Sequence, residues 1–190
     1  AYKVNYGQAG FYRVKYNERS NLNELRNLAL SKVLPPQDRW GLQNDLYALA
    51  TRGDVSIDEY LDFLSGYKDE DAFLPLTSIA NNLFQAYLIM EGTKRDRIAA
   101  FGKSFLGGVL NHIGYEPKSG ERQTISILRD QIIWHAAVYG FRDAVDFSFA
   151  KFSSLMKGKS IHPDIMKSVM QVGALIGNDE AMGWFKKRID

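Results

Sequence analysis

The sequence predicts an all-α fold, a stacked array of antiparallel helix pairs, with a short β-hairpin at the N-terminus. Three observations predict it. From residue 18 onward, apolar residues recur at helical spacing in successive segments of similar length. Short polar, proline- or glycine-containing breaks separate these segments. Only residues 1–17 show the alternation that is typical of a strand.

The N-terminal residues are expected to form a β-hairpin arm and its turn. Residues 11–16 alternate in the period-two pattern of a half-buried strand, and Gly7 and Gly10 bracket a short polar link. No later segment offers this strand a partner, and an isolated hairpin is barely stable in water. We therefore expect residues 1–17 to belong to the β-sheet of an upstream domain, so that the chain is part of a larger protein.

The predicted helices share an apolar stripe on one face and polar residues or helix breakers at their ends. Asp38 and Ser56 are expected to be N-caps of their helices. The expected ranges are 21–32, a helix that begins at Asp38 and ends at Gly53, a short helix after Ser56, then 73–91, 93–110, 121–139 and three further segments up to the C-terminus.

Glycine divides the last part of the chain at regular intervals. Gly140, Gly158 and Gly177 lie 18 and 19 residues apart, each at the C′ position of an amphipathic segment. Asn178 is expected to cap the final segment, with Met182, Phe185 and Ile189 facing inward. Similar helices joined by short turns predict a curved, right-handed α-α superhelix of the HEAT or armadillo type over residues 18–190, incomplete at its C-terminus.

Composition limits the classes of partner. The chain of 190 residues carries 24 Lys and Arg against 22 Asp and Glu, a balance that disfavours nucleic acid and acidic membranes as partners. It has no Cys, which excludes disulfides and thiolate metal sites. No apolar run is long enough to span a membrane, and no Asn-x-Ser/Thr sequon occurs. We expect a cytoplasmic protein, although residues upstream of such a fragment could hold a targeting signal.

No catalytic constellation is visible in the residues. His112, His135 and His162 do not fall in a zinc-binding spacing. Gly102-Lys103-Ser104 lacks the earlier glycine and preceding strand of a phosphate-binding loop. The sequence therefore predicts neither catalytic nor metal-ligating residues in this chain.

Two arginines beside carboxylates leave two interpretations open. Arg39 lies within two helical turns of Asp38 and Asp45, and Arg129 precedes Asp130. Buried arginine–carboxylate pairs most often orient helices. Alternatively, such an arginine faces an internal cavity and meets the anionic end of a ligand.

Several stretches resemble the C-terminal half of the aminopeptidase N family of zinc metallopeptidases. Val4-Asn5 followed by Gly10–Tyr16 is similar to the family's "N…G(Y/F)YRV.Y" strand, which closes a β-sandwich domain. Asp38–Ala50 is similar to the "R..L..D.f.La" helix, and Leu128–Ile133 to an "lR..ll" helix. The HExxH zinc motif and the GAMEN motif, which lie in an earlier domain of the family, do not occur in this chain.

The resemblance implies that the chain is a helical bowl domain of a zinc aminopeptidase, which removes N-terminal residues from peptides with zinc-activated water. The bowl would enclose the active-site cavity and control peptide access, and it would be inactive alone. Its implied partners are the upstream catalytic and β-sandwich domains and the peptide substrate, with zinc in the parent protein. Arg129 is the implied substrate-binding residue. The alternative function is a helical-repeat scaffold that binds a protein on its concave face.

Overall fold

The structure is a computed structural model that describes residues 1–189. Asp190, the last residue of the predicted helical domain, lies outside them. Within the described residues the protein has nine α-helices and no strand, which confirms the all-α class. The helices form two compact units, Ala1–Phe101 and a second unit from Gly102 onward. The curved superhelix and the domain boundary after residue 17 stay predictions.

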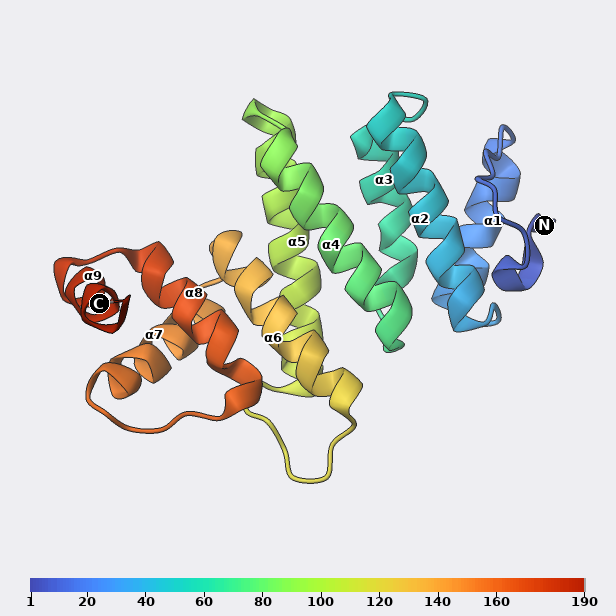
Figure 1. Ribbon diagram of the computed structural model, residues 1–190. Coiled ribbons are helices and arrows are strands. Elements are labelled where there is room, and N and C mark those ends of the chain that lie inside the picture. The colour runs from blue at the N-terminus through green and yellow to red at the C-terminus, as the bar shows by residue number, and fades with distance from the viewer. Residues whose placement is uncertain (190) are drawn as a thin grey trace. The chain divides into compact units, whose positions relative to one another are not determined.

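The first unit is built around α2, which packs against α3 and α4 (Figure 1). In the same unit α1 packs against η2. Leu25, Tyr60, Leu64, Ile79 and Leu83 are fully buried where these helices meet. The elements are η1 (Tyr6–Gln8), α1 (Arg19–Leu30), α2 (Pro36–Arg52), α3 (Ile57–Leu64), η2 (Ser65–Tyr67), α4 (Phe73–Ile89) and the start of α5 (Gly92–Ile113).

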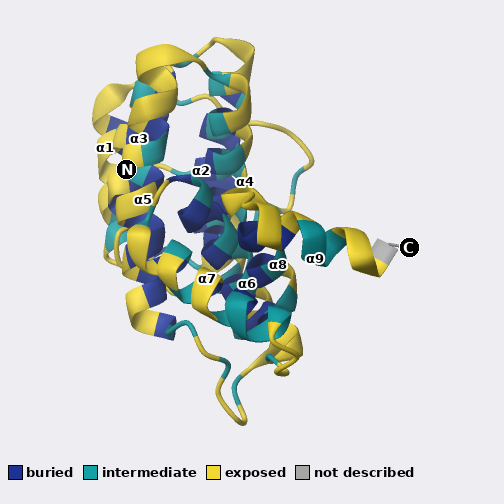
Figure 2. Cartoon of the chain, turned by 90° about the vertical axis from the view of Figure 1, so that its left-hand side faces the viewer, coloured by how far each residue is buried: buried dark blue, intermediate teal, exposed yellow. Residues whose placement is uncertain are grey.

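The second unit is built around α8, which packs against α6, α7 and α9. Its core includes Leu110, Ile132, Phe152 and Val169, all fully buried. Within each unit, the buried and exposed residues lie on different faces of the helices (Figure 2). The further elements are α6 (Gln123–Val138), α7 (Arg142–Met156), η3 (Pro163–Ile165), α8 (Met166–Ile176) and α9 (Asp179–Ile189).

Several predicted helix ends are confirmed. Ser56 accepts a hydrogen bond from the Glu59 amide and forms a complete capping box at the start of α3. Asn178 Oδ1 accepts from the Ala181 amide at the start of α9. Gly140, Gly158 and Gly177 all have positive φ, which a C′ residue of the left-handed type requires.

Two expectations about single residues are wrong. Asp38 is not the N-cap of α2: the helix begins at Pro36, whose fixed φ suits the first helical position, and Pro35 precedes it. The Asp38 side chain is instead fully buried against the N-terminal segment. Met182 is 45% exposed, because α9 turns Trp184 and, as expected, Phe185 toward Phe152. The side chain of Ile189 lies outside the part of the chain that the structure describes.

The predicted N-terminal hairpin is not confirmed, because no strand occurs among the described residues. Asn5, Gly7 and Gln8 have positive φ, which interrupts an extended chain. A strand also needs a partner that accepts its N–H groups. Here the amides of Gly7 and Val14 donate to carboxylates of α2 instead.

In the part of the chain that the structure describes, no helix combines the length and hydropathy that crossing a bilayer requires.

Gly66 lies in η2 and packs against Arg26 of α1. A Cβ added there would lie 2.8 Å from the backbone oxygen of Arg26 and 2.6 Å from its Cγ. Since a backbone atom cannot move aside cheaply, we expect Gly66→Ala to lower the free energy of unfolding by about 1–3 kcal/mol. Urea unfolding followed by circular dichroism measures this.

Gly108→Ala is the matched control, because its Cβ would meet nothing within 4 Å on an exposed face of α5. Replacing an exposed helical glycine with alanine should raise stability by a few tenths to about 1 kcal/mol. Equal effects of the two substitutions would contradict the close approach at Gly66.

Candidate functional site

Arg129, the residue expected from the sequence to bind substrate, is fully buried on α6. Its Nη1 and Nη2 donate to the two carboxylate oxygens of Glu121 at 2.5 and 2.6 Å, and its Nε donates to the Gly114 carbonyl at 2.9 Å. Nη2 also donates to the carbonyl of Ile113. The guanidinium thus holds the end of α5 and the following loop against α6, and the substrate contact stays a prediction.

Glu121 is the partner of Arg129 that sequence reasoning missed, since it lies eight residues upstream in the predicted helix rather than beside the arginine. The Arg129 hydrogen bonds, with a smaller contribution from Ser126, lower the pKa of Glu121 to about 2. Asp130, the sequence neighbour of Arg129, instead accepts the Ser168 amide at the start of α8. The Glu121 carboxylate is therefore ionised at neutral pH.

Arg39 also has a distant partner. Its Nε and Nη2 donate to Glu70 at 2.6 and 2.7 Å, and Nη1 donates to the Leu34 carbonyl. Glu70 in turn accepts the amides of Asp71 and Ala72 at the start of α4. The hydrogen bonds that Arg39 donates to Glu70 raise the pKa of Arg39. Arg39 therefore forms a buried arginine–carboxylate pair of the helix-orienting kind, with Glu70 rather than with Asp38 or Asp45.

Asp38 and Asp45 hold the N-terminal segment, residues 1–17, on α2. They lie seven residues apart and so face the same side of the helix. Asp38 accepts from the Gly7 amide at 2.9 Å and pairs with Lys3 Nζ at 2.7 Å. Asp45 accepts from the Val14 amide at 3.2 Å and from Arg13 at 3.1 Å.

We expect Asp38→Asn to loosen the first half of this segment, because it leaves the ammonium of Lys3 buried without its counter-charge. Hydrogen exchange of the Gly7 amide should accelerate at least about tenfold, which corresponds to a loss of about 1.4 kcal/mol. Asp45→Asn is the comparison, because its ion-pair partner Arg13 is half exposed. Unchanged exchange at Gly7 in Asp38→Asn would show that the carboxylate does not hold the segment.

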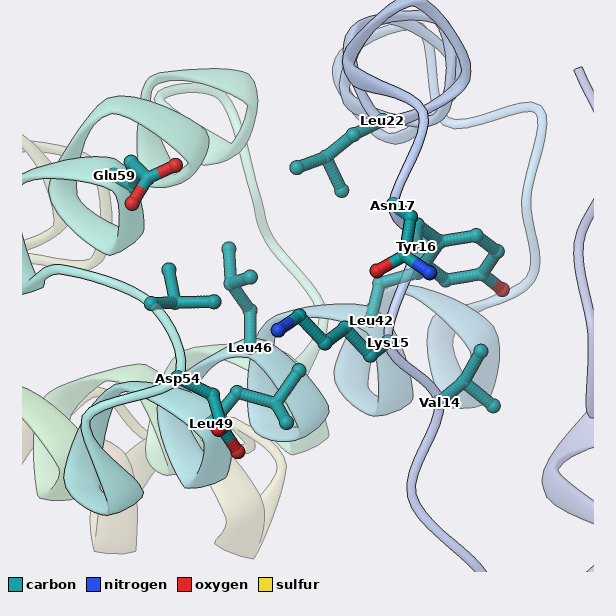
Figure 3. A pocket seen from close by; sticks show the side chains of 11 residues that line it. Val14, Lys15, Tyr16, Asn17, Leu22, Leu42, Leu46, Leu49, Asp54 and Glu59 are labelled. Carbon is teal, nitrogen blue, oxygen red and sulfur yellow. The ribbon is translucent and has the colours of Figure 1, made fainter.

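A pocket of about 170 Å³ lies between residues 14–17, α1, α2 and the turn before α3 (Figure 3). Its floor consists of Leu42, Leu46 and Leu49, which are 5–7% exposed. Val14, Leu22 and Val55 add apolar walls. A pocket of this size takes an apolar group about as large as a benzene ring.

The rim of this pocket is charged with both signs. Lys15, Asn17, Asp54 and Glu59 line it, and in Figure 3 the Lys15 side chain extends toward the side that carries the two carboxylates. Lys15 forms no ion pair with any residue that the structure describes, so the opposite charges stay more than 4.0 Å apart. The hydrogen bond from the Ser56 amide lowers the pKa of Glu59, and Lys15 contributes weakly.

Over residues 1–189, no three His, Cys, Asp or Glu side chains gather to hold a metal ion. The three histidines lie on different elements: His112 on α5, His135 on α6, and His162 before η3, where its Nδ1 accepts the Asp164 amide. The described residues therefore do not fit a zinc site.

The outer face of the N-terminal segment carries uncovered aromatic side chains. Phe11 is fully exposed, and Tyr6 and Tyr12 are 66% and 55% exposed. Such a group of aromatic residues on one short segment is typical of an interaction surface.

Comparison with known proteins agrees with the family resemblance of the sequence over nearly the whole chain. A family model described as the ERAP1-like C-terminal domain matches residues 1–189. Aminopeptidase M1 from Arabidopsis thaliana is 27% identical over 87% of this chain and 20% of its own length. Tricorn protease-interacting factor F2 from Thermoplasma acidophilum is 35% identical over 80% of this chain and 19% of its own.

A third relative is puromycin-sensitive aminopeptidase from Caenorhabditis elegans. It is 28% identical over 94% of this chain and 19% of its own length. The chain thus spans about a fifth of each of these curated relatives.

Proposed function

Because this chain belongs to the ERAP1-like C-terminal domain family, we propose that it is the non-catalytic helical domain of a zinc aminopeptidase. The parent enzyme would remove N-terminal residues from peptides in the cytoplasm. The observation that carries the proposal is the family match over residues 1–189, joined to relatives whose names are those of aminopeptidases.

Zinc would supply the activated water of the hydrolysis. The residues described here do not form a site for it, and no step of the reaction is assigned to them. The contribution proposed for this chain is physical: to enclose the cavity, to limit which peptides enter, and to position them. Its partners would be the catalytic and β-sandwich domains of the same protein and the peptide.

The exposed aromatic residues of the N-terminal segment support the presence of an upstream domain that covers them. Tyr6, Phe11 and Tyr12 would be covered by the preceding β-sandwich, in which residues 1–17 would complete a sheet. In that assembly the segment would be the connection between the sheet and α2, with Asp45 holding its last part.

The test compares the complete gene product with the 190-residue chain. We expect zinc and the release of N-terminal residues from aminoacyl-aminomethylcoumarins in the complete protein, and neither in this chain alone. Removing residues 18–190 from the complete protein should change its preference for peptide length more than its hydrolysis of the small substrate.

Two results would overturn the proposal in part or whole. A complete protein without zinc and hydrolysis would leave the helical-repeat scaffold as the function. An unchanged dependence on peptide length after the deletion would remove the role in access while keeping the family's chemistry.

A further inference from the structure

The pocket beside Lys15 has an apolar interior and a mouth whose charges are not paired across it. Leu42, Leu46 and Leu49 form a floor without polar side-chain atoms. At the rim, Lys15 and Asn17 make no hydrogen bonds with the described residues, and both offer N–H donors. The interior therefore suits an apolar group of a ligand, and the N–H donors suit an anionic group next to it.

The opposite side of the mouth carries acceptors. Asp54 pairs with Arg52 at Oδ2, and Glu59 accepts from Ser56 at Oε2. A carboxylate has about four lone-pair sites, so both side chains can still accept a hydrogen bond from a cation. Since Lys15 extends toward these carboxylates without reaching them, a molecule with both charges would fit between the two sides (Figure 3).

We propose that this pocket binds a free α-amino acid with an apolar side chain, such as leucine or phenylalanine. The side chain would occupy the floor, the carboxylate would meet Lys15 and Asn17, and the ammonium would meet Asp54 and Glu59. A residue inside a peptide carries neither charge, and a terminal residue carries only one. The free amino acid alone uses both sides of the rim.

The volume agrees with this ligand. The pocket of about 170 Å³ is close to the 150 Å³ of an apolar cavity that accepts benzene, so it holds one leucine or phenylalanine side chain but not two. Binding does not require hydrolysis, so this proposal and the proposed peptidase function can fail separately.

The test is a ¹H–¹⁵N chemical-shift titration of the 190-residue chain with four ligands. Leucine should bind with a Kd of about a millimolar, as expected for a ligand of its size. Leucinamide lacks the carboxylate and N-acetylleucine lacks the ammonium, so each should bind about fivefold more weakly, the effect of one exposed charge pair. Glycine lacks the side chain and should show no saturable shifts.

Two pairs of variants test whether leucine binds in this pocket. Val55→Phe fills the pocket and should abolish leucine binding, whereas Val33→Phe, at an exposed valine elsewhere in the same unit, should leave it unchanged. Lys15→Gln should weaken leucine about fivefold and leave leucinamide unaffected. Lys68→Gln, at an exposed lysine outside the pocket, should change neither.

Circular dichroism of each variant separates loss of binding from loss of the fold. Absence of saturable leucine binding, or unchanged binding by folded Val55→Phe, would overturn the site. Leucinamide or N-acetylleucine binding as tightly as leucine would overturn the assignment of a zwitterion.

Discussion

Replacing Glu70 with glutamine should lower the free energy of unfolding by about 3–5 kcal/mol, the effect of breaking a buried ion pair on one side. The side chains of Glu70 and Arg39 are 1% and 5% exposed, so water cannot replace the lost charge. The substitution leaves the guanidinium buried beside a neutral amide. It also weakens the acceptor for the Asp71 and Ala72 amides, which begin α4.

Urea unfolding monitored by circular dichroism measures this loss, and Asp62→Asn is its control. Asp62 pairs with Arg26 at 2.9 Å but is 70% exposed, so its loss should cost about 0–1 kcal/mol. A double variant Arg39→Met, Glu70→Leu should regain part of the stability, because neither residue then carries a buried charge. An effect of Glu70→Gln no larger than that of Asp62→Asn would refute the importance of the buried pair.

Arg129→Met should cost about 2–4 kcal/mol, somewhat less than Glu70→Gln. The variant leaves Glu121 unpaired, but this carboxylate is 13% exposed and water can reach it. The carbonyls of Ile113 and Gly114 also lose their donor. Thermal and urea unfolding of the variant measure the change.

The pH dependence of the unfolding free energy tests whether the Arg129–Glu121 ion pair is the cause of this stability loss. The folded-state pKa of Glu121 is about 2, below the ordinary value of 4.5, so ionisation of this group favours the folded state. The stabilisation is complete above an unfolded-state pKa of about 4.3 and is lost as the pH falls to about 2. The difference in unfolding free energy between the parent and Glu121→Gln should therefore shrink from pH 5 to pH 2.

The same variants separate the two roles considered for Arg129. If Arg129 only holds α5 against α6, breaking its pair with Glu121 lowers the free energy of unfolding. Arg129→Lys should then restore little of the lost stability, because lysine cannot bind Glu121 with two donors in a fork. A substrate contact would instead raise the KM of the complete protein for peptides, with stability unchanged.

Helices were predictable where the signal was local. The 3.6-residue spacing of apolar residues, the Ser56 capping box and the positive-φ glycines at 140, 158 and 177 act within a few residues of themselves. Ser56 and Asn178 cap as expected for the same reason. The class of the fold follows from these local signals.

The candidate sites depend on contacts between distant residues, and these the sequence did not reveal. Arg39 and Glu70 are 31 residues apart, and the Gly7 amide meets Asp38 across a similar separation. The alternation of residues 11–16 predicts a strand, but pairing requires a partner that no local pattern contains. The pocket beside Lys15 combines four separate stretches of the chain, so no spacing could have indicated it.

The carboxylates of α2 also bear on how the chain avoids self-association. A segment with several aromatic residues and unpaired N–H groups is a template for intermolecular β-pairing and aggregation. Asp38 and Asp45 occupy two of these N–H groups and place negative charge beside them. In a chain that lacks its upstream domain they therefore act as gatekeepers, because they keep these N–H groups from pairing with another copy of the segment.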